Sequence, residues 1–168
     1  MTAPSEVLSS ATLRAIRDRF EGNPLLGHML ATTSVIRAAR IATERAEAAL
    51  APLGLSMVRF EILGLIDSAG GRLSLRELKK ATMLHPATMT GTIDALVAPR
   101  LVRRSTPADN RRLVMAELTP RGRATTARAF AALSEAQFGL PDLTEEQGLQ
   151  VAEILGAIGG RARHDLTD

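Results

Sequence analysis

The stretch 72-RLSLRELKKATMLHPATMTGTIDALVAPRLVRRSTPADNRRLVMAELT-119 decides the fold of this chain. Near its start, Ser74 and Glu77 stand three residues apart, which is the spacing of a capping box at a helix start. The apolar side of the short helix that follows consists of Leu75, Leu78 and Ala81. Pro86 then suits the first position of a second helix, because the amide that proline lacks has no partner there.

The second helix has two chemically different sides. Met89, Ile93, Leu96 and Val97 recur at helical spacing and predict a buried face. The opposite side is small and polar, a composition that lets a helix approach another surface closely: Thr88, Thr90, Gly91 and Asp94. Pro99 ends this helix. The sequence therefore predicts two short helices joined by a tight turn.

Two β-compatible segments follow the helices, 101-LVRRS-105 and 111-RRLVMAEL-118. The residues between them, TPADN, include the turn formers proline, aspartate and asparagine. A short helix pair followed by a ribbon with Arg111 and Arg112 at its tip predicts a winged helix-turn-helix. The expected fold class is mainly α with a small β wing (α+β).

Charge is concentrated in the same stretch. Residues 72–123 contain eleven Lys or Arg against four Asp or Glu, a local net charge of +7, whereas the whole chain carries only +3. A basic segment on an otherwise acidic body is typical of proteins that bind nucleic acids, because neutralised phosphates release condensed counterions. The alternative for a charge run alone is a solvated surface, but the order of motifs favours DNA.

The chain resembles the MarR family of transcriptional regulators over about residues 55–122. The resemblance is carried by GLSMVRFEILGLI, SLRELKKATMLHPATMTGTIDAL, LVRR and DNRRLVMAELTPRG, in this order and spacing. Gly91 and Ala95 stand where many members have arginines, and Arg100 stands where a helix-ending glycine is usual. The wing is one residue longer than usual, so the family's wing aspartate corresponds either to Asp109 or to Asn110.

The resemblance and the residue types together predict how DNA would be contacted. Base edges would be contacted from the front of the second helix by His85, Thr88, Thr90 and Gly91, and thymine methyl groups by Pro86 and Ala87. Phosphates would be held by Ser74, Arg76, Lys79 and Lys80. The minor groove would receive Arg111 and Arg112. Arg103 and Arg104 alternate along a strand, so only one of them is expected to face DNA. Because the second helix lacks Arg, Asn and Gln, shape and water-mediated contacts should contribute much of the specificity.

Composition bounds the remaining possibilities. The chain has 168 residues, 45% of them hydrophobic, and can bury a core of its own. It has no cysteine, which excludes disulfides and cysteine-based metal sites, nucleophiles and oxidant sensors. The polar start MTAPSEVLSS and the lack of a long apolar run predict neither signal peptide nor membrane span. We expect a cytoplasmic protein without a metal or cofactor.

Further helices are expected at about residues 11–20, 24–51 and 56–68, before the short helix pair, and at 120–138 and from 144, after the wing. The expected division is a flexible tail (1–10), N-terminal dimerisation helices (11–54), the winged helix-turn-helix (55–119) and C-terminal dimerisation helices (120–168). Thr144 and Gln147 form a second capping box before the last helix. The apolar stripes of these helices favour pairing with a second copy; packing within one chain is the alternative.

The resemblance also implies a small-molecule pocket between the DNA-binding unit and the dimerisation helices, often for aromatic or phenolic anions that weaken DNA binding. In this chain its walls would come from the long first helix and the helix after it. This nominates as effector-binding residues His28, Thr32, Arg59 and Glu61. Because the chain has neither Trp nor Tyr, such a pocket would have little to stack on an aromatic ligand.

Two other functions compete with a DNA-binding regulator. An enzyme is disfavoured, because the three histidines are far apart and no nucleotide-binding or hydrolase motif is present. A helical interaction module that keeps the winged-helix shape but lacks specific DNA binding is the stronger alternative, favoured by Gly91, Ala95 and Arg100. For a regulator, repression is the default mode, since a bound dimer blocks polymerase.

Overall fold

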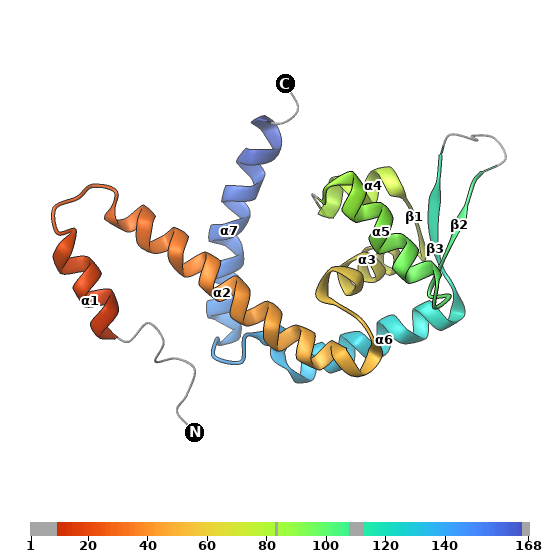
Figure 1. Cartoon of the computed structure of the whole chain (residues 1–168), viewed down its shortest axis with the longest axis horizontal. Coiled ribbons are helices and arrows are strands. Elements are labelled where there is room, and N and C mark those ends of the chain that lie inside the picture. The colour runs from red at the N-terminus through yellow and green to blue at the C-terminus, as the bar shows by residue number, and fades with distance from the viewer. Residues whose placement is uncertain (1–9, 83, 108–112, 166–168) are drawn as a thin grey trace. The chain divides into compact units, whose positions relative to one another are not determined.

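The computed structural model describes residues 10–82, 84–107 and 113–165 of the chain. The chain divides into two compact units, Met1–Ile41 (unit 1) and Ala42–Asp168 (unit 2). Most described residues are helical, and three short strands form one small sheet (Figure 1). This confirms the predicted class, mainly α with a small β wing.

Unit 1 contains α1 (Ser10–Arg19) and the first part of α2 (Leu26–Leu50). The helices are separated by the predicted break, where Gly22 adopts a φ of 81°. The Asn23 side-chain oxygen then accepts a hydrogen bond from the Leu25 amide at 2.9 Å, which helps to start α2. Exposed apolar side chains in this unit are Phe20, Leu25, Met29, Val35 and Ile36.

Unit 2 begins with the end of α2, a single turn η2 (Ala51–Leu53), and α3 (Met57–Ser68). Gly54 breaks the chain between them with a φ of 66°. The Ser56 hydroxyl caps α3 by accepting a hydrogen bond from the Arg59 amide at 3.4 Å. The buried side chains of α3 are Phe60, Ile62, Leu63 and Ile66. The predicted helix is therefore confirmed, and it lies at the centre of the core.

The predicted capping box starts α4 (Leu75–Thr82). The Ser74 amide donates to the Glu77 carboxylate at 3.0 Å, and the Glu77 amide donates to the Ser74 hydroxyl at 3.1 Å. Leu78 is fully buried, but Ala81 is exposed, contrary to the prediction. Thr82, one helical turn beyond Leu78, is half-buried in its place, because it lies closer than Ala81 to the side that Leu75 and Leu78 share.

The sheet has the strand order β1-β3-β2, with both pairs antiparallel. Strands β2 (Val102–Ser105) and β3 (Met115–Leu118) are the predicted ribbon. Strand β1 (Arg72–Ser74) was not predicted, because three residues before a helix have no periodicity of their own and pair with a strand about forty residues away. The sheet thus joins the entry of α4 to the wing.

Helix α5 (Pro86–Val97) has the predicted buried face, with Met89, Ile93 and Leu96 in the core. These side chains belong to the same apolar cluster as the buried residues of α3, Leu78 of α4, and Val102 and Ala116 of the sheet. Removing this burial would cost several kcal/mol, since each large core side chain contributes roughly 1.5–3 kcal/mol. One face of α5 is therefore anchored, and the other face is presented outward.

Helix α6 (Pro120–Glu135) starts as predicted, because the Thr119 hydroxyl accepts a hydrogen bond from the Gly122 amide at 2.9 Å. After the turn η3 (Gln137–Gly139), the second predicted capping box starts α7 (Glu145–Asp165): the Thr144 amide donates to Gln147 at 2.9 Å. The large apolar side chains that α7 leaves exposed are Leu149, Val151, Ile154, Leu155 and Ile158.

No single helix in the described ranges is long and apolar enough to cross a membrane. The bent pair Leu26–Leu53 and Met57–Ser68 passes such a test only when taken together, as buried helices of a protein core also do.

Arg100, which stands where the MarR family usually has glycine, is held in the left-handed region with a φ of 60°. Its amide donates to Val97 at 2.9 Å, and the next amide donates to Leu96 at 3.0 Å, so the two bonds close the end of α5. A side chain in this conformation costs about 1–2 kcal/mol. Arg100 therefore stores strain at the junction between α5 and β2.

Replacing Arg100 by Gly should raise the free energy of unfolding by about 0.5–1 kcal/mol, since relief of strain exceeds the added entropy of the unfolded chain. Urea denaturation measures this as a higher midpoint at an unchanged slope. Arg100→Ala is the matched control, because it removes the guanidinium but keeps the Cβ. If alanine stabilised as much as glycine, the strain would not lie in the backbone.

Candidate nucleic-acid interface

The outward face of α5 carries the residues predicted to contact base edges. His85, Pro86, Ala87, Thr88, Thr90 and Gly91 are all exposed. His85 is the N-cap, and its Nδ1 accepts a hydrogen bond from the Ala87 amide at 3.4 Å. This bond orients the imidazole at the helix start. The structure thus brings the six residues together at the N-terminal half of one exposed helix face.

Two threonine hydroxyls of α5 donate their protons to the helix backbone. Thr90 donates to the Pro86 carbonyl at 3.1 Å, and Thr92 donates to the Thr88 carbonyl at 2.8 Å. Such bonds to the residue four positions earlier are a local habit of threonine in helices. Each hydroxyl therefore keeps only acceptor lone pairs for an external partner.

The basic residues predicted to hold phosphates are on α4. Arg76, Lys79 and Lys80 are exposed, whereas Ser74 is only 4% exposed. The Ser74 hydroxyl donates to the Glu77 carboxylate at 2.5 Å, and this bond lowers the Glu77 pKa, helped by the Ser74 amide and the nearby lysine and arginine. Glu77 thus completes the helix cap, as predicted. The Ser74 hydroxyl is bonded to Glu77 within the same cap.

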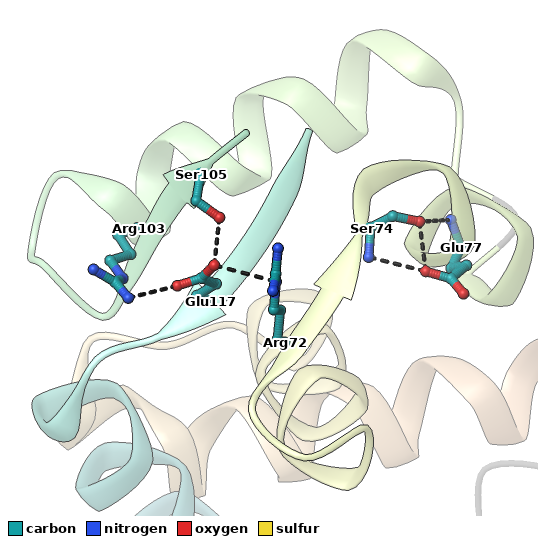
Figure 2. A network of polar contacts seen from close by, with 6 residues as sticks. All are labelled: Arg72, Ser74, Glu77, Arg103, Ser105 and Glu117. Carbon is teal, nitrogen blue, oxygen red and sulfur yellow. Dashed lines mark hydrogen bonds and ion pairs between the residues drawn. The ribbon is translucent and has the colours of Figure 1, made fainter. Parts of the chain in front are cut away.

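Glu117 of β3 is the centre of a charged network on one face of the sheet (Figure 2). Its carboxylate pairs with Arg103 of β2 at 2.7 Å and with Arg72 of β1 at 3.3 Å, and it accepts a hydrogen bond from Ser105. The Ser105 hydrogen bond and the Arg103 charge lower the pKa of Glu117, against the effect of burial. This network could not be predicted from the sequence, because it depends on the register of three strands.

Arg104 lies on the other side of β2. Its guanidinium pairs with Asp94 of α5 at 2.8 Å. The two neighbouring arginines thus point to opposite sides of the strand, as predicted. The Arg104–Asp94 pair connects α5, the helix predicted to contact base edges, to the wing at the surface.

The tip of the wing lies outside the described residues. Arg111 and Arg112, which are predicted to enter the minor groove, lie in this part. So do Asp109 and Asn110, the two residues that could correspond to the family's wing aspartate. These predictions remain as they stand.

Lowering the pH should remove the contribution of Glu117 to stability. Its folded-state pKa is below the ordinary glutamate value, so this contribution is complete above the ordinary value and disappears as the pH falls through the folded-state pKa. We expect the difference in unfolding free energy between wild type and Glu117→Gln to shrink between about pH 5 and pH 3. Urea denaturation at several pH values measures it. If this difference did not vary with pH, ionisation of Glu117 would make no contribution to the free energy of unfolding.

The four predicted effector residues belong to both units. His28 and Thr32 are exposed on α2 in unit 1. Arg59 and Glu61 are on α3 in unit 2, where the Arg59 guanidinium donates to the Gly54 carbonyl at 3.2 Å and burial raises the pKa of the otherwise exposed Glu61. The predicted pocket remains a prediction.

Unit 2 contains a surface cavity of about 480 Å³. It lies between η2, the start of α3, the end of α5 and the first turns of α6, and its lining includes three arginines and no carboxylate: Arg59, Arg121 and Arg128. Of the predicted effector residues, only Arg59 lines this cavity. Arg121 and Arg128 were not predicted as site residues, because the approach of α6 to α3 is a tertiary contact.

Comparison with known proteins agrees with this architecture. The sequence profile of the MarR family matches residues 55–114. The HTH-type transcriptional repressor Mb2911 of Mycobacterium bovis is 30% identical over 135 residues, which are 80% of this chain and 93% of that protein. The family consists of transcriptional regulators, not enzymes.

Two solved structures resemble the chain over most of its length. Sco5413, a MarR family transcriptional regulator from Streptomyces coelicolor, is 27% identical with a TM-score of 0.74, and the match covers 82% of this chain and 96% of that one. BpsR of Bordetella bronchiseptica, whose DNA binding is regulated by 6-hydroxynicotinic acid, is 25% identical with a TM-score of 0.66 over 80% and 98%. The chain is therefore a DNA-binding transcriptional regulator of the MarR family.

Proposed function

We propose that this regulator is a homodimeric repressor that binds a pseudo-palindromic operator. A two-fold axis would place the two α5 helices in successive major grooves, one helical turn apart. The observation that carries the proposal is the division of α5: an apolar face anchored in the core and an exposed face of small residues, beside a strongly basic segment. A cytoplasmic location is part of the proposal.

Base contacts in this proposal come from the exposed N-terminal half of α5, from His85 to Gly91. Phosphate contacts come from Arg76, Lys79 and Lys80 of α4, whose exposed cations sit on the helix before it. Ser74 is not part of the proposed surface, because its hydroxyl is buried and bonded to Glu77. Of the two wing-strand arginines, Arg103 is the more exposed, with 72% of its side chain accessible against 38% for Arg104.

The proposed dimer rests on α7. Its apolar stripe at helical spacing, formed by Val151, Ile154, Leu155 and Ile158, is exposed in the single chain. A helix of this kind gains stability when a second copy covers its apolar face. Packing of the same stripe within one chain was the alternative, and the exposure of these side chains favours the second copy.

The proposal also includes a small-molecule effector that releases the protein from DNA. The cavity lined by Arg59, Arg121 and Arg128 has the charge to hold a carboxylate or phenolate, since guanidinium groups bind planar anions with paired hydrogen bonds. The regulation of BpsR by 6-hydroxynicotinic acid supports an effector of this class. We therefore infer that a small organic anion would be the ligand.

Selection of bound fragments from genomic DNA at about physiological salt tests the function, because nonspecific binding is weak there. Recovery of one pseudo-palindrome with half-sites one turn apart is the expected result. Recovery of unrelated fragments alone would instead favour the helical interaction module without specific DNA binding.

Replacing Lys79 by Ala should weaken binding to all DNA sequences about equally and reduce the salt slope by ~1, because one phosphate contact is lost. Arg40→Ala, which removes an exposed cation of α2, is the matched control and should leave the slope unchanged. Titration of operator and random DNA at several salt concentrations measures both. An unchanged slope for Lys79→Ala would remove this residue from the phosphate contacts.

A further inference from the structure

The exposed face of α5 offers almost no hydrogen-bond donors to DNA. Between Pro86 and Val97 the sequence contains no Lys, Arg, Asn, Gln or Ser. The centre of the exposed face consists of Ala87 and Gly91, which are one helical turn apart. A Cβ built on Gly91 meets no heavy atom within 4 Å, so this part of the face is open.

The polar groups beside this centre point acceptors outward. The single hydroxyl proton of Thr90 is directed to the Pro86 carbonyl, and that of Thr92 to the Thr88 carbonyl. Asp94 adds a carboxylate, which is held by Arg104 at 2.8 Å. The outer surface from Ala87 to Asp94 therefore combines methyl groups with oxygen lone pairs, and the Thr88 hydroxyl is its remaining donor group.

His85 supplies one more donor at the end of the helix. Its Nδ1 accepts the Ala87 amide, so in the neutral ring the proton is on Nε2. One N–H cannot form the paired contact to N7 and O6 through which guanine is usually recognised. His85 thus does not replace the bidentate side chain that α5 lacks.

The four bases respond differently to such a surface. In the major groove, guanine presents two acceptors, adenine and cytosine each present an amino donor, and thymine presents a methyl group. The oxygen lone pairs of Thr90 would attract an amino group and repel guanine O6 and N7. The methyl groups of Ala87 and the threonines would contact a thymine methyl.

We propose that the base steps facing residues 87–91 of α5 are recognised through thymine methyl and exocyclic amino groups, and that guanine is rejected on the contacted strand. This inference rests on the proposed operator binding. In this proposal, base specificity depends on the Thr90 hydroxyl oxygen as a hydrogen-bond acceptor and on the lack of a side chain at Gly91.

Selection from random DNA with three proteins tests the inference: wild type, Thr90→Val and Gly91→Arg. Valine keeps the size and one methyl group of threonine but lacks the oxygen, so the preference for adenine or cytosine at one position should fall about fivefold or more. Arginine adds a bidentate donor in open space, so guanine should be gained at one position. The positions that change identify the steps that α5 faces, and wild type should select against guanine there.

The outcomes separate the inference from the function. Guanine enrichment by wild type at those positions, or two variants with unchanged motifs, would overturn the inference while operator binding stands. Failure of wild type to select any sequence would overturn the proposed function itself. Nonspecific binding at low salt serves as the folding control, because it depends on the basic residues of α4 and should be equal for wild type and Thr90→Val.

Discussion

Replacing Gly122 by Ala should lower the free energy of unfolding by about 3 kcal/mol or more, because the new methyl group has no room. Its Cβ would lie 1.9 Å from the Leu101 carbonyl oxygen and 2.9 Å from the carbonyl carbon. That carbonyl accepts hydrogen bonds from the Thr119 amide at 3.1 Å and from the Thr119 hydroxyl at 3.2 Å. Moving it aside would disturb the cap of α6 and the start of the wing together.

Gly64→Ala on α3 is the matched control for Gly122→Ala. It makes the same chemical change inside a helix of the same unit, but a Cβ at Gly64 meets no heavy atom within 4 Å. The control should be neutral or stabilise by up to ~1 kcal/mol, as expected for alanine in a helix. Urea denaturation compares the two variants, and a small loss for Gly122→Ala would mean that Leu101 can move freely.

Replacing Ile154 by Glu should raise the dissociation constant of the proposed dimer about 100-fold or more. Ile154 is 64% exposed in the single chain and lies on the stripe that a second copy would cover. In a two-fold dimer the change buries two uncompensated carboxylates, each of which costs several kcal/mol. Loss of the dimer should also lower operator affinity, because two linked DNA-binding units bind two half-sites about 10²–10⁴-fold more tightly than one unit binds one half-site.

Leu149→Glu is the matched control, which distinguishes the loss of a specific interface from a general effect of an added charge on α7. Leu149 is 67% exposed, close to the value for Ile154, but the helical period places it on the opposite side from Ile158. Sedimentation at several concentrations should show a dimer for Leu149→Glu and a monomer for Ile154→Glu. Dimers in both variants would move the interface away from α7, and monomers in both would remove the distinction between its faces.

Local chemistry explains what could be predicted from the sequence. Both capping boxes, Ser74 with Glu77 and Thr144 with Gln147, occur as expected because their partners are three residues apart. The ends of α5 follow from Pro86 and Pro99, and its two faces follow from the helical period.

The sequence by itself thus determined the helices, the two capping boxes, the β-compatible segments of the wing and the exposed face of α5, since these depend on residue types and spacings within short stretches of the chain. Only the tertiary structure decided that Arg72–Ser74 forms a third strand, that Glu117 binds two arginines across it, and that Arg121 and Arg128 meet Arg59 around one cavity. Each of these depends on strand register or helix packing between segments tens of residues apart. A side chain's own neighbours in the chain carry no signal of such partners, because chain folding alone brings them together.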